Sequence, residues 1–224
     1  MGFIQFGKPH IYWDTTGDKV YDPNIGVIRN IYFNEDRVDA GKLLLNKAEE
    51  FLKSNNFDEC FAFNHSLGLS CNAYHGKLHE SKEYIADLLK DYGYKVEHEN
   101  IYYSIDLSIL KQIEIDENIK VLNNGVDENN IEVINLLYKN KKIGESIILY
   151  LDNLNIAYMN TIWVDNNNSS KGFGSQFIRL ISDYLLKNGY KRLDLDTAKN
   201  NFGAQKFYER NGFTNEGITR SYFK

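Results

Sequence analysis

The sequence predicts an α/β fold made of two tandem units, each a mixed, mostly antiparallel sheet flanked by helices. Segments that alternate apolar and polar residues, as strands do, are interleaved with segments of helical periodicity. A shift of 133 residues superimposes part of the first half on the second without a gap, from Ile31 on Val164 to Phe57 on Tyr190. Hydrophobic residues make up 42% of the 224 residues, which is enough for packed cores. The repeat indicates duplicated units.

The first unit is expected to begin with strands. Phe3–Phe6 and His10–Trp13 flank a turn at Gly7-Lys8-Pro9, a pattern that predicts a β-hairpin. A third strand is expected over Ile25–Phe33.

A helix follows from Asp39, with apolar residues at helical spacing, and it stops at Ser54-Asn55-Asn56. The remaining elements of the first half are a strand over Asp58–Phe63, a helix over Ser81–Asp91 and a strand over Tyr94–Leu107.

The second half repeats this order. Its expected elements are a meander over Ile131–Leu151 with a turn at Lys139–Lys142, a strand over Ile156–Val164, a helix over Phe173–Lys187, a strand over Arg192–Asp196, a helix over Asn201–Arg210 and a last strand after Gly212. Asn-rich stretches at 123–130 and 166–168 are interpreted as linker and loop. The boundary between the units is placed near residue 110.

Charge and composition exclude some classes of partner. The net charge of −5 argues against nucleic acid and anionic membranes, which require clustered Lys and Arg. No run approaches the length needed to span a bilayer, and the first residues lack the pattern of a signal peptide, so a cytoplasmic location is expected. Cys60 and Cys71 are interpreted as buried free thiols.

An anion site is predicted where a strand runs into a helix. After Val164 the chain reads Asp165-Asn166-Asn167-Asn168-Ser169-Ser170-Lys171-Gly172-Phe173-Gly174. Free backbone N–H groups and the positive end of a helix can hold a pyrophosphate, and glycines let the backbone approach it closely.

A second segment, Asn201-Phe202-Gly203-Ala204-Gln205-Lys206-Phe207-Tyr208-Glu209-Arg210-Asn211-Gly212-Phe213, follows after a strand. The two segments, in this order, resemble the pyrophosphate loop and the N-x-x-A-x-x-x-Y-x-x-x-G-F helix of the GCN5-related N-acetyltransferases (GNAT). The resemblance covers residues 118–224 specifically and residues 1–107 loosely. It implies two GNAT-like units and acetyl-CoA as co-substrate.

The resemblance also implies the residues of a coenzyme site. These are Trp163, Val164, Ser169, Ser170, Lys171, Gly172, Phe173, Gly174, Ser175, Asn201, Ala204, Phe207 and Tyr208. Two positions depart from the family pattern: Asn166 stands where Pro is usual, and Ser169 where Gln or Arg is usual. The main-chain donors are unaffected by these departures.

Tyr208 is the expected general acid, which would protonate the departing thiolate, with a strand N–H near Trp163 or Val164 as oxyanion donor. Expected bases are Glu145 and, as an alternative, Glu132, since the strand over Ile156–Val164 carries no carboxylate. The structural alternatives are a core aromatic for Tyr208, a helix cap for Asn201 and a solvated charge for either Glu.

The first unit, residues 1–110, is expected to be a degenerate, non-catalytic copy of the second, residues 111–224. Asp39 and Gly41 stand at the positions of Gly172 and Gly174, and Leu89 stands at that of Tyr208. A carboxylate repels phosphate and Leu gives no proton.

No metal is expected. Cys71, His75 and His79 share a spacing of four residues, which on a helix would align three ligands for Zn²⁺, but the segment is interpreted as a loop.

The expected activity is the transfer of an acetyl group from acetyl-CoA to the primary amine of a small molecule, by direct attack of the amine on the thioester. The alternatives are a catalytically silent CoA-binding or sensing module and an interaction scaffold. A monomer or homodimer is expected.

Overall fold

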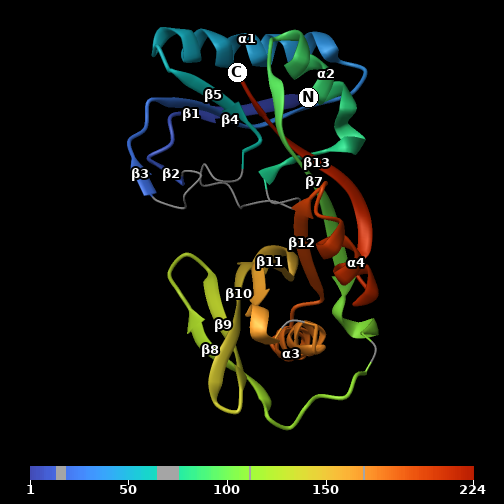
Figure 1. Cartoon of the computed structure of the whole chain (residues 1–224). Coiled ribbons are helices and arrows are strands. Elements are labelled where there is room, and N and C mark those ends of the chain that lie inside the picture. Colours follow the sequence, from blue (N-terminus) through green and yellow to red (C-terminus); the bar gives the residue numbers. More distant parts are fainter. Residues whose placement is uncertain (14–18, 65–75, 111, 169) are drawn as a thin grey trace. The chain divides into compact units, whose positions relative to one another are not determined.

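The computed structural model describes residues 1–13, 19–64, 76–110, 112–168 and 170–224. The chain divides into two compact units (Figure 1), whereas the sequence places a single boundary near residue 110. Unit 1 consists of Met1–Asn100 together with Gly217–Lys224, and unit 2 consists of Ile101–Glu216. The strands β7 (Lys95–Asp106) and β13 (Thr214–Phe223) therefore contribute residues to both units.

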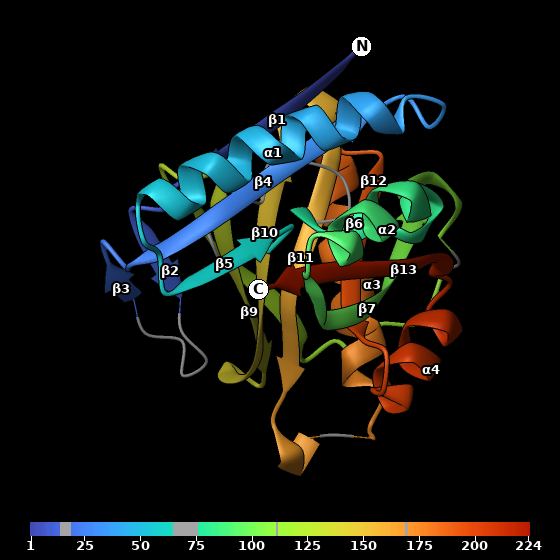
Figure 2. The same ribbon diagram turned by 90° about the horizontal axis from the view of Figure 1, so that it is seen from above.

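The described part of unit 1 contains two helices and several strands. They are β1 (Gly2–Gly7), β2 (Ile11–Trp13), β3 (Lys19–Tyr21), β4 (Ile25–Phe33), α1 (Val38–Ser54), β5 (Glu59–Ala62), β6 (Leu78–His79), a 3-10 turn (Glu80–Lys82) and α2 (Glu83–Asp91). β1 pairs with β4 in antiparallel and β5 pairs with β4 in parallel. The ends of β5 and β13 are antiparallel neighbours. Helix α1 lies across β1 and β4 (Figure 2).

The core of unit 1 is formed where α1, α2 and the sheet meet. Ile28 and Ile31 of β4, Leu45 of α1 and Leu89 of α2 are fully buried in one apolar cluster. The apolar residues of α1 recur at helical spacing, so one face of the helix is covered by the sheet.

The hairpin expected at the amino terminus is wrong. β1 pairs with β4 from Gly2↔Phe33 to Gly7↔Val27, and β2 pairs with β3 instead. Pairing with β4 brings Ile4 and Phe6 against the core cluster. The burial of these two side chains depends on a partner strand distant in the sequence, since Gly7 pairs with Val27, and the residues of a local turn do not reveal such a partner.

Unit 2 contains a larger sheet and two helices. Its elements are a 3-10 turn (Leu107–Ile109), β8 (Ile119–Val126), β9 (Ile131–Tyr138), β10 (Lys141–Leu151), a 3-10 turn (Asp152–Leu154), β11 (Ile156–Val164), a 3-10 turn (Asn166–Asn168), α3 (Phe173–Lys187), β12 (Arg192–Ala198) and α4 (Phe202–Arg210). The strand order runs from β7 through β12, β11, β10 and β9 to β8. β8 to β11 are antiparallel neighbours, and β11 and β12 are parallel.

Residues 123–126 lie in β8 rather than in a linker, so that part of the interpretation is wrong. β8 pairs with β9 from Ile119↔Tyr138 to Val126↔Glu132, with an irregularity after Asn123. Asn has low β propensity, but backbone pairing with β9 outweighs that preference. Residues 166–168 form a 3-10 turn.

Helix α3 is confirmed over Phe173–Lys187, and its buried face includes Phe177, Ile181 and Leu185. These side chains share the interior of unit 2 with Ile134 and Ile148 of the sheet, which are fully buried. Among the helices that the structure describes, none is long and apolar enough to cross a membrane.

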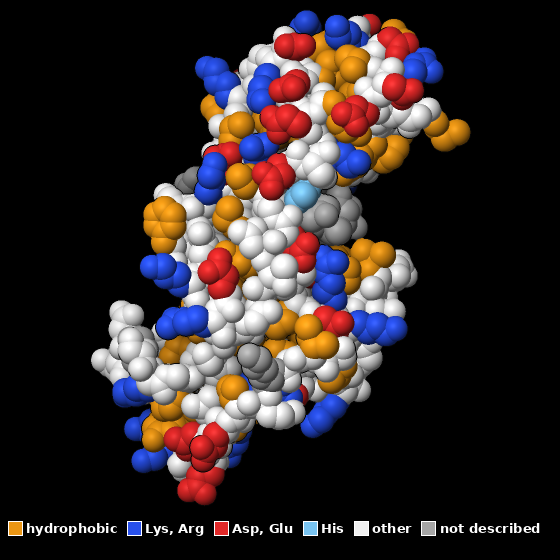
Figure 3. Space-filling view, turned by 90° about the vertical axis from the view of Figure 1, so that its right-hand side faces the viewer, with side chains coloured by type: hydrophobic (Ala, Val, Ile, Leu, Met, Phe, Trp, Pro, Cys, Tyr) orange, Lys and Arg blue, Asp and Glu red, His pale blue; other side chains and the backbone are white. Residues whose placement is uncertain are grey.

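Charges are mixed over the surface. On the face seen in Figure 3, Lys and Arg side chains are interspersed with Asp and Glu, and no continuous basic patch forms among the described residues of that face. This distribution agrees with the net charge of −5.

Candidate active site

The parallel strands β11 and β12 part in the middle of unit 2. Their register runs from Ile156↔Arg192 to Met159↔Leu195, and the rest of β11, from Asn160 to Val164, continues beyond the last pair. Backbone groups on that side of β11 therefore have no ladder partner in β12.

The orientation of these backbone groups follows from the pairing of β11 with β10. The Asp165 N–H donates to the Ile143 carbonyl at 2.8 Å, so the N–H groups of alternate residues, Trp163 among them, point toward β10. The N–H groups of Ile162 and Val164 consequently point into the gap between β11 and β12. Val164 thus has the orientation that the sequence interpretation requires of an oxyanion donor, and Trp163 does not.

The loop after β11 ends at the amino terminus of α3. Gly172 precedes the helix with φ +80°, in the left-handed region, and its carbonyl accepts from the Gln176 N–H at 3.2 Å. The N–H groups of Phe173, Gly174 and Ser175 have no acceptor within the helix, because the first turn of any α-helix lacks one. This end of α3 presents donors and a positive partial charge.

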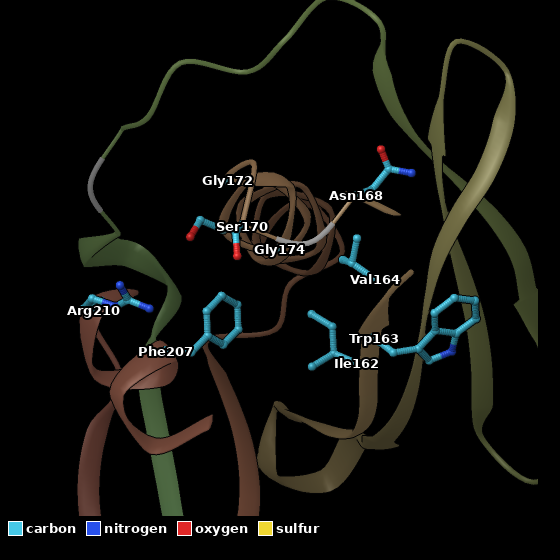
Figure 4. Close-up of a pocket in the computed structure, with 10 residues that line it drawn as sticks. Ile162, Trp163, Val164, Asn168, Ser170, Gly172, Gly174, Phe207 and Arg210 are labelled. Atoms are coloured by element: carbon cyan, nitrogen blue, oxygen red, sulfur yellow. The ribbon is translucent and has the colours of Figure 1, made fainter. Parts of the chain in front are cut away.

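A cavity of about 620 Å³ connects this helix end with β11. Its lining residues are Ile162, Trp163, Val164, Asn168, Ser170, Gly172, Gly174, Ser175, Phe207 and Arg210. In Figure 4, Ile162 and Val164 lie on one side, Phe207 and Arg210 of α4 on the other, and Gly172 at the end of α3. The Trp163 indole points away from the cavity, toward β10, where Lys142 Nζ lies 5.8 Å from its ring centroid.

Arg210 is a cationic lining residue that the sequence interpretation missed. Its Nε donates to the Lys206 carbonyl at 3.2 Å, which leaves the rest of the guanidinium directed elsewhere. Its position two residues after Tyr208, at the end of α4, is the signal that could have revealed it. Lys171 Nζ donates to Oδ1 of the lining residue Asn168 at 3.2 Å. Both cations favour an anionic ligand.

Gly174 is constrained by a neighbouring helix. A Cβ at this position would lie 3.1 Å from Cζ and 3.2 Å from Cε2 of Phe207. Gly174 therefore allows α3 and α4 to approach each other, whereas a Cβ at Gly172 would meet nothing within 4 Å. Only Gly172 opens free space beside the cavity.

We expect Gly174→Val to lower the free energy of unfolding by about 1–3 kcal/mol, because its side chain would overlap the Phe207 ring. Denaturant titration measures the change. The double variant with Phe207→Leu should recover part of the loss, since the two residues are in contact and their effects should not be additive. Additive effects would contradict this packing role.

Asn201 caps α4. Its Oδ1 accepts from the Ala204 N–H at 3.2 Å, as the structural alternative requires, and its side chain is exposed. A role toward the coenzyme would need the Asn201 Nδ2 group, which the cap leaves available.

Asn201→Ala should lower the free energy of unfolding by about 1 kcal/mol, because the Ala204 N–H loses its acceptor. Asn201→Ser should restore that stability, since a hydroxyl caps equally well. If Asn201 also contacts the coenzyme, the Ser variant keeps a raised dissociation constant for acetyl-CoA in calorimetry. Equal affinity of the Ser variant and the wild type would limit Asn201 to capping.

Tyr208 lies in an aromatic cluster of unit 2. Its ring centroid is 5.9 Å from that of Tyr103 and 5.7 Å from that of Phe213. The residue is 9% exposed and does not line the cavity described above, although its neighbour Phe207 does. Its hydroxyl donates to no acceptor among the residues that the structure describes. Burial, followed by the negative charge of Asp196, raises the pKa of Tyr208 to about 12.

The two expected bases are occupied by other groups. Glu132 is fully buried and accepts from the hydroxyls of Tyr150 and Tyr184. Glu145 pairs with Lys142, whose Nζ lies 2.5 Å from Oε2. Neither carboxylate lines the cavity.

The remaining predicted coenzyme, metal and thiol residues have the following positions. The buried Phe173 ring lies 4.9 Å from that of Tyr138, and His79 Nδ1 contacts the Ser81 hydroxyl at 2.8 Å. Ser169, Cys71 and His75 lie outside the described residues. Cys60 is a half-buried free thiol. Within the described part of the chain, no group of three or more His, Cys, Asp and Glu residues could hold a metal ion.

Comparison with known proteins places this geometry in a family. The model of the Acetyltransferase (GNAT) family matches residues 90–213, more than half of the chain. No curated protein sequence matches.

Solved structures show the same fold at low sequence identity. A GCN5-related N-acetyltransferase from Sphaerobacter thermophilus has a TM-score of 0.63 at 12% identity, over 89% of this chain and 72% of that one. A tandem GNAT protein from the clavulanic acid biosynthesis pathway has a TM-score of 0.65 at 9% identity, over 92% and 77%. A GCN5-related N-acetyltransferase from Kribbella flavida has a TM-score of 0.56 at 9% identity, over 99% and 90%. On the match of the family model, this chain belongs to the GNAT acetyltransferase family.

Proposed function

We propose that unit 2 transfers an acetyl group from acetyl-CoA to the primary amine of a small molecule. The observation that carries this proposal is the cavity of about 620 Å³, which joins the amino terminus of α3 to the gap between β11 and β12. A long ligand with an anionic middle and an amide-containing arm fits such a path, since donors for phosphate stand at one end and strand N–H groups at the other.

The residues at the cavity fit acetyl-CoA. The N–H groups at the start of α3, Ser170 and Arg210 would hold the pyrophosphate, and Gly172 leaves room beside them. The Ile162 N–H group would bind the arm of the coenzyme. When bound, acetyl-CoA supplies an acetyl thioester with a thiolate leaving group.

Tyr208 would supply the proton for that thiolate. Its raised pKa keeps the hydroxyl protonated at neutral pH, and because the hydroxyl has no acceptor among the described residues, it is free to donate to a ligand. The Val164 N–H would stabilise negative charge on the carbonyl oxygen.

Unit 1 is proposed to be a degenerate copy of the same fold. In both units an antiparallel pair, β1–β4 or β10–β11, is followed by a long helix and then by a strand parallel to the second member of the pair. The glycines Gly41 and Gly174 each face a Phe ring, that of Phe33 or Phe207.

The amino terminus of α1 is unsuited to phosphate. Asp39 in its first turn is ionised, because hydrogen bonds from Arg37 at 3.0 Å lower the pKa of its carboxyl. The residue at the place of Tyr208 is Leu89, which is buried. We therefore assign coenzyme binding to unit 2 alone. A cytoplasmic location, a monomer or homodimer, and the lack of nucleic-acid or membrane partners stay predictions.

One observation favours a second candidate, a silent CoA-binding module. Tyr208 is buried and does not line the described cavity. Incubation of the protein with acetyl-CoA and a panel of primary amines, followed by mass spectrometry of the amines, distinguishes the two. Acetylated amine supports the transferase, whereas saturable coenzyme binding without any product supports the silent module.

A further inference from the structure

A second set of acidic and tyrosine side chains lies on the face of the unit 2 sheet opposite α3. The hydroxyls of Tyr184 in α3 and Tyr150 in β10 both donate to Glu132, so the Tyr150 side chain faces α3. Ala157 of β11 pairs with Tyr150, so its side chain faces α3 as well. Successive side chains of a strand alternate between faces. Tyr158 therefore lies on the opposite face, together with its partner Asp194 and with Asp196 two residues further on.

The two carboxylates of β12 have different surroundings. Asp194 is fully buried and accepts from Arg192 at 2.5 and 2.9 Å and from the Tyr102 hydroxyl at 2.6 Å. Its negative charge is neutralised within the fold. Asp196 is only half-buried, and it is the first residue of β12 beyond the last pair with β11, Met159↔Leu195. Asp196 thus stands where the strands begin to part.

Asp196 lies near two tyrosines. Burial, followed by the negative charge of Asp196, raises the pKa of Tyr158, which lies on the same sheet face. The Tyr158 ring is stacked on that of Tyr102, with the ring centroids 6.4 Å apart. The charge of Asp196 also acts on Tyr208. Tyr208 belongs to α4 and contacts Tyr103, whose hydroxyl bonds to Glu209 of the same helix. Tyr103 follows Tyr102 in β7, so Tyr208 and Asp196 lie on opposite faces of the sheet.

We propose that Asp196 is the acceptor-side carboxylate of this enzyme, which binds the ammonium group of the amine substrate and removes its proton. The inference rests on the proposed function and adds the residue that Glu145 and Glu132 do not supply. It also names the substrate class more closely: a cationic primary amine whose ammonium group reaches the half-buried carboxylate at the gap.

The step balances without a further reactant. Asp196 takes one proton from the ammonium, and the neutral amine nitrogen forms a bond to the acetyl carbon. The carbon–sulfur bond breaks, and Tyr208 gives its hydroxyl proton to sulfur. The nitrogen then loses a second proton, which restores the Tyr208 hydroxyl through solvent, and Asp196 releases its proton to solvent.

The test compares Asp196→Asn with Asp127→Asn, which removes an exposed carboxylate at the β8–β9 turn. Calorimetry gives the dissociation constant for acetyl-CoA, and turnover is measured with 1,4-diaminobutane, 2-phenylethylamine and L-lysine. We expect Asp196→Asn to bind acetyl-CoA within twofold of wild type and to lose about 10²-fold or more in kcat/KM for the amine. When the CoA-loaded protein is titrated in the calorimeter with the amine that wild type acetylates, Asp196→Asn should bind that amine more weakly than wild type does. Asp127→Asn should be unchanged throughout.

Asp196→Glu and Asp196→Gln form a second pair, because their side chains have the same size and differ in charge. The Glu variant should turn over the amine at least tenfold faster than the Gln variant. Equal rates in that pair, or turnover of Asp196→Asn within about threefold of wild type, would overturn the assignment. Wild-type protein that binds acetyl-CoA but acetylates none of the amines would instead contradict the proposed function, so the two failures are distinguishable.

Discussion

Gly172→Trp is expected to abolish acetyl-CoA binding, with a loss of at least 10²-fold in affinity. A Cβ at Gly172 points into open space beside the cavity, so the indole would occupy the volume next to the free N–H groups of α3. The change should act on the ligand rather than on internal packing, because among the described residues no atom other than those of its chain neighbours lies within 4 Å of that Cβ. Calorimetric titration measures the affinity.

Gly189→Trp provides a matched control at the other end of the same helix. Gly189 has φ +90°, close to the +80° of Gly172, and a Cβ there also meets nothing within 4 Å. Both substitutions impose a left-handed conformation on Trp, at a cost of about 1–2 kcal/mol in folding. The two variants should therefore lose similar stability in denaturant titration, but only Gly172→Trp should lose acetyl-CoA. Equal coenzyme affinity in both would place the ligand elsewhere.

The second large effect is expected from Tyr208→Phe, which should lower kcat by about 10²-fold or more while the dissociation constant for acetyl-CoA changes little. The variant removes only a hydroxyl that has no acceptor among the described residues, so the aromatic cluster with Tyr103 and Phe213 is retained. Steady-state kinetics and calorimetry separate the two quantities.

Tyr103→Phe is the corresponding control. Its ring lies beside that of Tyr208, and its hydroxyl bonds to Glu209 at 3.1 Å, away from the proposed chemistry. We expect Tyr103→Phe to lose about 0.5–1.5 kcal/mol of stability and to keep its turnover. A comparable loss of kcat in both Tyr variants would assign Tyr208 to packing rather than to proton donation.

The pH dependence of the wild type follows from the same residue. Burial and Asp196 raise the pKa of Tyr208 to about 12, so its neutral form, the proposed proton donor, persists above the ordinary tyrosine value near 10. Its contribution to stability is accordingly complete below pH 10 and is lost as the pH rises through about 12.

Sequence patterns predicted the elements whose partners are local. The α3 boundaries and those of β11 match the expected ranges, because Gly172 precedes a run of apolar residues at helical spacing and the strand is a short apolar run. β1 could not be paired correctly, because its partner β4 is chosen by the core that Ile4 and Phe6 enter. β8 is hard to predict because of its Asn residues, of which Asn123 pairs with Ile134 of β9.

The residues of the candidate site also divide into those with a local sequence signal and those whose position depends on the fold. The loop glycine and the α4 motif carry local signals, and the structure brings Gly172 and Phe207 to one cavity. Asp196 carries no motif: its significance depends on where β11 and β12 part and on the arrival of Tyr158 from the neighbouring strand. Glu145 is a candidate from the sequence because it is a carboxylate on a strand that precedes β11, and only the structure shows its pairing with Lys142.

The most direct test of the account is the stoichiometry of acetyl-CoA binding to the wild-type chain in a calorimetric titration. The ionised Asp39 at α1 should exclude phosphate from unit 1, while the N–H donors at the amino terminus of α3 should bind it in unit 2. One acetyl-CoA per chain is therefore expected. Two bound molecules per chain would show that unit 1 also holds the coenzyme, and the absence of saturable binding would contradict the proposed coenzyme site altogether.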